Sequence, residues 1–342
     1  MGDQDLLDLA ESIFADSAAS GTGLDAGLWT TLEQTGLARM TLPEAAGGSG
    51  GTLTDAAAVW QAAGAHAARV PLVETELAAW LLNVHRMEIP AGPLTVVSGE
   101  LSVRDAGQVR LGVGGTVTGV PWARDAAGIV LLTRAEVVLL RPAQVTVTEG
   151  ANLAEEPRDT VAVDATVPID AWSSSLASCH AELRLRAALG RSQLLAGAAR
   201  GALARTVRYA GERVQFGRPI GRFQAVQQQL ALAAAEVAAA GAAASAAAST
   251  AEREGFGAPA TAFAVAAAKA RTGEAAGEVA RIAHQVHGAI GFTREHDLRL
   301  LTTRLWAWRD EDGSDAHWQA ELGTTVLAAG PDALWPMVTG SP

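Results

Sequence analysis

The sequence is poor in cysteine, in lysine and in positive charge. Cys179 is the single cysteine among 342 residues, so no disulfide can form within the chain, and a reducing cytoplasm is compatible with this composition. Lys269 is the single lysine, and nearly every other cationic side chain is an arginine. The formal net charge is −11, which argues against a nucleic-acid partner because such partners require a basic face.

The first twenty residues are acidic and contain no basic start followed by an apolar run. We therefore expect no signal peptide and a cytoplasmic protein. The most apolar stretch, residues 230–250, consists mainly of alanine and contains Glu236. Because alanine forms helices well and is a weak membrane residue, this stretch predicts a helix of a soluble protein and no membrane partner.

Residues 1–90 predict an N-terminal helical domain, because apolar positions recur every three or four residues in three stretches. Pro43 and the glycine run at 47–51 interrupt this pattern, and Thr54 or Asp55 can cap the next helix. The glycine run could suggest a phosphate loop, but it lacks the Gly-Lys-Ser/Thr ending and no strand precedes it. A plain loop between two helices is the favoured interpretation.

The rest of the chain predicts a β domain followed by a helical bundle. Short β-branched segments separated by turn residues fill residues 91–172 and predict a small antiparallel domain of five to six strands. Residues 173–342 contain three long helical stretches and a shorter one that ends near residue 310, which predicts a four-helix bundle. The predicted fold class is therefore a multi-domain α+β protein.

Two separated motifs carry the functional argument. RYAGERVQFGRPIGRFQAVQQQLA at 208–231 and QVHGAIGFTREHDL at 285–298 resemble the acyl-CoA dehydrogenase family, and LPEAAGGSGGTLTDA at 42–56 is similar to the same family. The resemblance therefore spans the chain. It implies that FAD is the cofactor, that an acyl-CoA thioester is the substrate of an α,β-dehydrogenation, and that an electron-transferring flavoprotein accepts the electrons.

The residues of the first motif suit the chemistry of FAD. The guanidinium of Arg213 is a planar, permanently charged fork that fits a pyrophosphate. Phe216 supplies an apolar face for the adenosine half, and Gly217 ends the helix so that the chain can turn around the cofactor. The amide of Gln224 can donate and accept hydrogen bonds, which suits a purine edge.

The second motif matches the other anchor of the family. Gly288 lets backbone amides approach a phosphate closely. Gln285, Val286, Gly288 and Ala289 lie at the family's binding positions, and the resemblance implies that both motifs hold a flavin of a neighbouring subunit. His284 and His287 are three residues apart, but no third ligand is evident, so we expect a structural or flavin-adjacent role and no metal.

The half of the site that holds the flavin ring has no clear counterpart in this sequence. In the family, a Thr-Glu-Pro-Gly-Ser-Asp-like element and a Trp-Ile-Thr-like element of the β domain hold the ring. Residues 96–107 read VVSGELSVRDAG, which contains no such acidic-Pro-Gly-Ser element. The second element retains Trp122, but Pro121 and Ala123 replace its usual neighbours. The β domain is therefore predicted to have lost its ring-binding half.

The catalytic base is also in question, because the reaction needs a carboxylate against the α-carbon of the thioester. The family keeps a glutamate at one of two positions. The first corresponds to Asp312, which is one methylene shorter and lies in an acidic stretch that could equally be a solvated loop. The second, 26 residues before Arg213, is Ala187, and Glu182 lies five residues earlier. Asp312 is thus the candidate base of this chain.

The favoured interpretation is the non-catalytic small subunit of an actinobacterial, heterotetrameric (α2β2) acyl-CoA dehydrogenase. A larger subunit would then supply the base and the ring pocket, with FAD at the interface and a steroid side-chain or fatty acyl-CoA thioester as substrate. Two alternatives remain open: a self-sufficient homotetrameric enzyme that uses Asp312, and a non-enzymatic scaffold of the same fold. The sequence identifies neither the acyl group nor the partner.

Overall fold

A computed structural model describes residues 3–17, 21–99, 102–105, 110–174, 178–294 and 296–339. The chain divides into two compact units. The helical unit consists of Met1–Ala19, Leu53–Ala68 and Ala188–Pro342, and the sheet unit consists of Ser20–Thr52 and Arg69–Ala187. The N-terminal helices are thus divided between the two units. The three-part division drawn from the sequence (1–90, 91–172 and 173–342) stays a prediction.

The sheet unit contains two four-stranded sheets. Its helices are α2 (Ala26–Gln34) and α4 (Leu72–Val84), and its strands are β1 (Leu94–Ser98), β2 (Ser102–Asp105), β3 (Arg110–Pro121), β4 (Gly128–Leu132), β5 (Glu136–Leu140), β6 (Val145–Thr148), β7 (Arg158–Pro168) and β8 (Trp172–Ser174). One sheet has the order β1-β4-β5-β8 and the other the order β2-β3-β7-β6. Strands β4 and β5 are almost entirely apolar because nearly every residue in them is buried, whereas β7 alternates between buried and accessible residues along its first half.

The strands depart from the sequence expectation in number and in direction. The described residues form eight strands in this unit, in two sheets, where five to six strands were expected. Strand β1 pairs with β4 in parallel, from Leu94 opposite Gly128 to Ser98 opposite Leu132, whereas the other pairs are antiparallel. A parallel pair needs a crossover. Here β2 and β3 make it through the second sheet, so no crossover helix marks the pair in the sequence.

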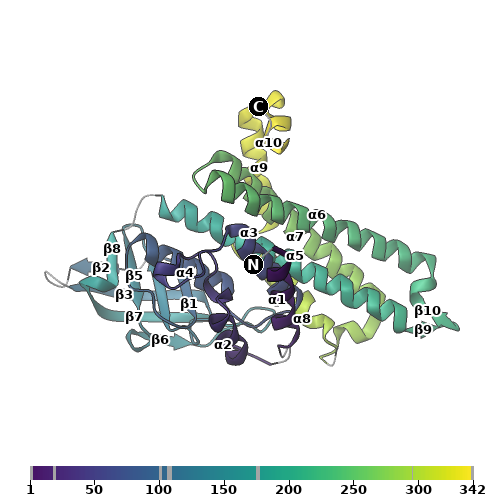
Figure 1. The fold of residues 1–342 in the computed structure, drawn as a ribbon, viewed down its shortest axis with the longest axis horizontal. Helices are drawn as coiled ribbons and strands as arrows, with labels where there is room; N and C mark the ends of the chain where they lie inside the picture. The colour runs from purple at the N-terminus through teal and green to yellow at the C-terminus, as the bar shows by residue number, and fades with distance from the viewer. Residues whose placement is uncertain are drawn as a thin grey trace. The chain divides into compact units, whose positions relative to one another are not determined.

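The helical unit holds the bundle that the sequence predicted (Figure 1). Its helices are α1 (Asp3–Ala15), α3 (Leu53–Ala65), α5 (Cys179–Glu212, of which residues 179–187 belong to the sheet unit), α6 (Gln224–Glu254), α7 (Pro259–His287), α8 (Leu298–Asp310), α9 (Asp315–Ala329) and α10 (Leu334–Thr339). Helix α9 was not predicted from the sequence. That helix contains Gly323 and two consecutive threonines, which are weak helix formers, and it buries little beyond Trp318.

Glycines let α3 and α5 pack closely within the helical unit. A Cβ atom added to Gly197 would lie 2.0 Å from the carbonyl oxygen of Gln61, and one added to Gly201 would lie 2.3 Å from that of Ala65. On the other helix, a Cβ atom at Gly64 would lie 2.3 Å from the carbonyl oxygen of Leu194. The two backbones are therefore in direct contact, and only glycine fits at these positions.

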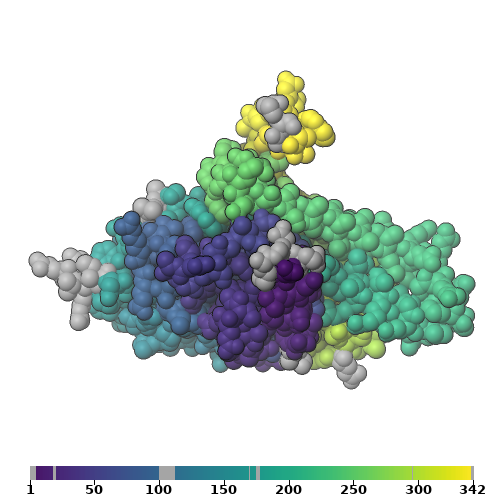
Figure 2. Space-filling model, in the orientation of Figure 1, coloured from purple at the N-terminus to yellow at the C-terminus, as the bar shows by residue number. Residues whose placement is uncertain are grey.

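Helix α6 is long, apolar and largely uncovered within the chain. Its length and composition would allow it to span a membrane, and 22% of its most apolar stretch is buried. Figure 2 shows the helix as an open part of the surface on the side in view. One such helix is weak evidence for a membrane span, so the expectation of a helix in a soluble protein stays a prediction.

Candidate flavin-binding site

The first motif folds into a tight hairpin at the end of α5. Strands β9 (Val214–Gln215) and β10 (Arg218–Pro219) pair, and Phe216 and Gly217 form the turn with φ values of 52° and 77°. Positive φ is costly for a phenylalanine, and a cost of this kind is most often found at functional sites. The Phe216 side chain is nevertheless 92% exposed. Its own chain therefore leaves most of its apolar face uncovered.

Arg213 and Gln224 flank this hairpin and also face outward. Both residues are exposed, and within the described residues neither side chain makes an ion pair or a hydrogen bond. Phe223 lies edge-on to Phe216, with 6.1 Å between the ring centroids, and the guanidinium of Arg218 stacks 4.4 Å from the centre of the Phe223 ring. The hairpin thus presents an unpaired cation and an aromatic face together, which are the groups that a pyrophosphate and an adenosine require.

The second motif lies where α7 ends and the 3₁₀ helix η6 (Gly288–Phe292) begins. Gln285, Gly288 and Ala289 are exposed and Val286 is half-buried. Gly288 has φ 64°, and no atom lies within 4 Å of the place where its Cβ would be. The turn therefore leaves open space beside its backbone, and a phosphate or ribose group fits there.

The fold brings the two motifs together at one end of the helical unit. Tyr209, one helical turn before Arg213, stacks on His287, with 4.3 Å between the ring centroids and 20° between the planes. Arg205, a further turn back, binds Asp297 at 3.0 Å. One face of α5 therefore touches the segment that carries the second motif. The predicted binding residues of both motifs lie outside these contacts, on the exposed side.

His284, just before the second motif, and His287 within it are buried in aromatic packing. His284 stacks on Phe292 and on Trp306, with 4.1 and 5.2 Å between centroids, and its Nε2 is 3.0 Å from the Thr302 hydroxyl. The Nδ1 atom of His287 is 2.8 Å from the carbonyl oxygen of Ala283. Burial lowers the pKa of both imidazoles. Among the described residues, no group of three or more His, Cys, Asp or Glu residues is arranged to hold a metal ion.

Asp312 lies in the turn between α8 and α9, in the helical unit. Its carboxylate is 2.9 Å from Nε of Arg191, a side chain that is 5% exposed and that also pairs with Glu311 at 3.3 Å. Asp312 has φ 56°, and its carbonyl oxygen accepts a hydrogen bond from the Trp318 indole at 3.0 Å. The residue is therefore held at its side chain and at its backbone, and its charge is balanced by a buried cation.

Lys269 holds the same turn from α7. Its ammonium group is fully buried and donates hydrogen bonds to the carbonyl oxygens of Arg309 and Gly313, at 2.9 and 2.5 Å. Burial lowers the pKa of Lys269 to about 8. No role for this lysine was predicted, since a single lysine in a helix gives no sign of where its side chain ends.

The other two positions considered for a base do not offer a free carboxylate. Ala187 is half-buried on α5 and has no ionisable group. The carboxylate of Glu182 accepts a hydrogen bond from Arg186 at 2.9 Å, as an i,i+4 pair on the same helix. Each carboxylate near the family's base positions is therefore paired with an arginine.

The two segments compared with the family's ring-binding elements lie in the sheet unit. Trp122 is 3% exposed and has φ 53°, so its indole packs inside the unit and presents no open face. Residues 96–107, where the acidic-Pro-Gly-Ser element was sought, lie in part outside the described residues. In the described part of the sheet unit, Trp122 is therefore a packing residue.

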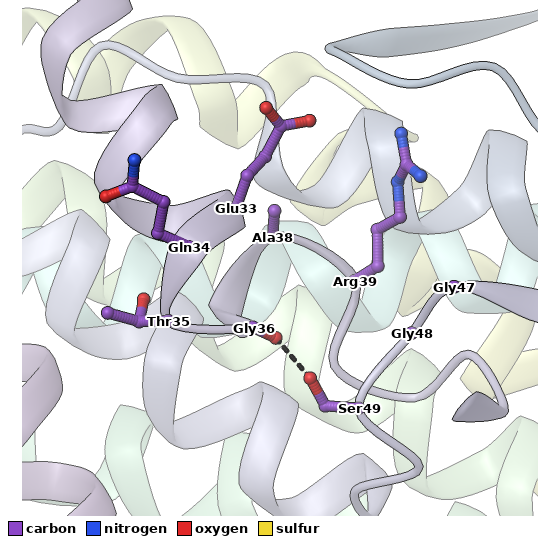
Figure 3. A pocket seen from close by; sticks show the side chains of 9 residues that line it. All are labelled: Glu33, Gln34, Thr35, Gly36, Ala38, Arg39, Gly47, Gly48 and Ser49. Carbon is purple, nitrogen blue, oxygen red and sulfur yellow. Dashed lines mark hydrogen bonds between the residues drawn. The ribbon is translucent and has the colours of Figure 1, made fainter.

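The glycine run lines a cleft of about 400 Å³ in the sheet unit (Figure 3). The amides of residues 46–51 all donate to carbonyl oxygens of residues 39–44, so the loop has no ring of free donors for a phosphate. The two charged residues of the cleft are also engaged. Arg39 donates to the carbonyl oxygens of Pro90 and Gly92 at 2.6 and 2.9 Å, and Glu33 accepts from the Gly92 amide at 3.0 Å. These contacts favour the plain loop.

Comparisons with known proteins identify the family. Residues 185–317 match the acyl-CoA dehydrogenase C-terminal domain. The chain is also 33% identical over 289 residues to acyl-CoA dehydrogenase IpdE2 of Mycolicibacterium smegmatis, and this alignment covers 83% of each protein. The chain therefore belongs to the acyl-CoA dehydrogenase family.

Solved structures agree with the fold. The ChsE4-ChsE5 complex from Mycobacterium tuberculosis contains a chain that superposes with a TM-score of 0.85 at 25% identity, over 96% of this chain and 98% of that one. A glutaryl-coenzyme A dehydrogenase superposes with a TM-score of 0.88 at 19% identity, over 96% and 95% of the two chains. The α+β fold class predicted from the sequence is confirmed.

Proposed function

We propose that this chain is the flavin-clasping, non-catalytic subunit of a heteromeric acyl-CoA dehydrogenase. In this assembly Arg213, Phe216 and Gln224 hold one side of an FAD at a subunit interface. Gln285, Val286, Gly288 and Ala289 hold another part of the same cofactor. When bound, FAD supplies the oxidant that accepts a hydride from the β-carbon of the acyl-CoA.

The observation that carries this proposal is the state of the first motif. Arg213 is exposed and makes no ion pair within the described residues, and Phe216 is 92% exposed on a strained turn. An isolated subunit gains nothing from that arrangement. A flavin seated against a second subunit would use both groups, because the pyrophosphate pairs with the guanidinium and the adenosine covers the ring.

The state of the base positions supports a partner that does the chemistry. A general base must reach the α-carbon and carry a charge that is free to take a proton. Asp312 and Glu182 are both paired with arginines, and Ala187 carries no acid. The ChsE4-ChsE5 structure is described as a complex. By analogy, we propose that a second, larger acyl-CoA dehydrogenase subunit supplies the base and the ring pocket in an α2β2 tetramer.

The substrate and the electron acceptor follow only from the family resemblance. We propose a bulky acyl-CoA thioester, such as a steroid side-chain or fatty acyl-CoA, because a tetramer with half the usual sites has room for it. Oxidation of short straight-chain acyl-CoAs alone by the purified assembly would contradict this substrate class. An electron-transferring flavoprotein is the acceptor that the family implies.

The test is the composition of the assembly. The chain is tagged in its native host, and the mass and flavin content of what co-purifies are measured. Two flavins in a tetramer of two different chains is the expected result. Four flavins in a tetramer of this chain alone would overturn the proposal in favour of a self-sufficient enzyme.

Arg213→Ala tests the binding role directly. Loss of a charge-assisted contact costs about 1.5–3 kcal/mol, so FAD should bind at least about ten-fold more weakly. Arg253→Ala is the matched control, because Arg253 is an exposed arginine of the same unit whose pairing with Glu254 lies at the far end of α6. Equal flavin affinity in both variants would leave only a scaffold role.

A further inference from the structure

The only tyrosine of the chain makes the stacked aromatic contact between the two flavin motifs, beside an ion pair of Arg208 with Asp297 at 4.0 Å. Tyr209 is half-buried on α5, and its ring lies nearly parallel to His287, with centroids 4.3 Å apart. Its hydroxyl donates to the backbone carbonyl of His287 over a long 3.4 Å. The stacked rings are therefore the main contact between Tyr209 and His287, and the Tyr209 hydroxyl contributes little.

His287 is held by several contacts besides the stack with Tyr209. Its Nδ1 is bound to the carbonyl of Ala283, which makes Nδ1 the donor of the neutral ring. His296 contacts its edge at 4.8 Å between centroids. A Cβ atom on Gly291 would lie 2.9 Å from that of His287, so η6 packs closely against the base of this side chain. His287 is therefore held next to the turn that presents Gly288 and Ala289.

The remaining polar atom of His287 has no partner. Its Nε2 makes no hydrogen bond within the described residues, and the residue is buried, with 4% of its surface exposed. A buried polar atom without a partner is costly, and in a native protein it calls for an explanation. The contacts that the His287 imidazole makes are therefore the stack of its ring face on Tyr209 and the hydrogen bond at Nδ1.

We propose that Tyr209 and His287 are positioning residues that set the spacing between the Arg213 hairpin and the Gln285–Ala289 turn, and thereby the affinity for FAD. This inference rests on the proposed function. Arg213 follows Tyr209 by one helical turn, and Gln285 precedes His287 by two residues, so the stack lies close in the chain to the binding residues of both motifs.

The size of the effect follows from the stack. Aromatic pairs contribute enough to change an equilibrium constant roughly three- to ten-fold. Tyr209→Leu should therefore raise the dissociation constant of FAD by roughly that factor in the assembly purified through a tag on this chain. Tyr209→Phe keeps the stacked ring and should restore affinity to within about two-fold of the original protein.

A double-mutant cycle separates positioning from general destabilisation. If Tyr209 acts by placing the turn, Tyr209→Leu should cost less affinity when Gln285→Ala has already removed a contact of that turn. Additive losses would overturn the inference, because a purely structural defect would weaken both proteins alike. His317→Phe is the matched control: it removes an exposed histidine that contacts Trp318 on α9, away from both motifs, and should leave FAD affinity unchanged.

Arg213→Ala distinguishes failure of this inference from failure of the proposed function. Weaker FAD binding in Arg213→Ala together with unchanged binding in Tyr209→Leu overturns the positioning role alone. Unchanged binding in both variants overturns the flavin site itself. If Tyr209→Leu does not assemble, His287→Leu removes the opposite face of the same stack and is measured in its place.

Discussion

Replacement of Asp312 by asparagine separates a structural carboxylate from a catalytic one. Removing one partner of a fully buried ion pair costs about 3–5 kcal/mol. Here the Asp312 side chain is 28% exposed and Glu311 still balances Arg191, so we expect a loss of about 1–2 kcal/mol. Asparagine tolerates positive φ, so the backbone at 56° is kept and only the charge is lost.

Two measurements on the purified assembly test this reasoning. The melting temperature of Asp312→Asn should fall by about 2–6 °C, whereas turnover with acyl-CoA should stay within about two-fold of the original protein. Asp310→Asn is the control, because Asp310 is 71% exposed and should change neither quantity. Loss of turnover in Asp312→Asn with an unchanged melting temperature would refute the reasoning and identify Asp312 as the base.

Three further predictions concern stability. Gly197→Ala places a Cβ 2.0 Å from a backbone oxygen and should destabilise the protein by about 1–3 kcal/mol. Gly323→Ala, on an open helix surface, should instead stabilise it by about 0.5–1 kcal/mol. Urea unfolding measures both changes, and equal effects of the two substitutions would contradict the close contact between α3 and α5. Because burial lowers the pKa of His284 below its usual 6.5, the unfolded chain binds more protons at this site. The unfolding free energy should therefore fall as pH drops below about 6.5, and His284→Phe should reduce that slope; an unchanged slope in His284→Phe would contradict this origin. The pKa of Lys269 is lowered from 10.5 to about 8, so between these pH values the unfolded chain binds one more proton than the folded chain at this site. The unfolding free energy should therefore rise by about 1.4 kcal/mol per pH unit between pH 8 and 10.5. Lys269 is the single lysine, so Lys269→Met should abolish this rise, and a rise that persists would assign it to another group.

The helical bundle could be predicted because its pattern is local. Apolar residues at three- and four-residue spacing, with Pro259 and Gly255 at a helix boundary, place α6 and α7 close to their observed limits. The parallel pairing of β1 with β4 could not be predicted, because strand direction depends on which strands become neighbours. Helix α9 was missed for a related reason: it is stabilised mainly by the burial of Trp318 against other elements.

The candidate site, like the fold, could be predicted only where it depends on local sequence. The motifs named Arg213, Phe216 and Gln224 directly from residue type and spacing. Their exposure, and the absence of a partner for Arg213 within the described residues, is visible only when the chain is folded. The ion pair between Arg191 and Asp312 joins residues 121 positions apart, so no local pattern announces it.

The sequence alone determined the family resemblance, the helices that bear both motifs and the residue types suited to a flavin, because these depend on local periodicity and fixed spacing. The tertiary structure decided which charges are free and which are neutralised. It brought Tyr209 onto His287 and Arg191 onto Asp312, since contacts between distant segments arise only when helices pack. The physical reason is that a side chain acquires its charge balance, burial and geometry from neighbours that the linear sequence does not specify.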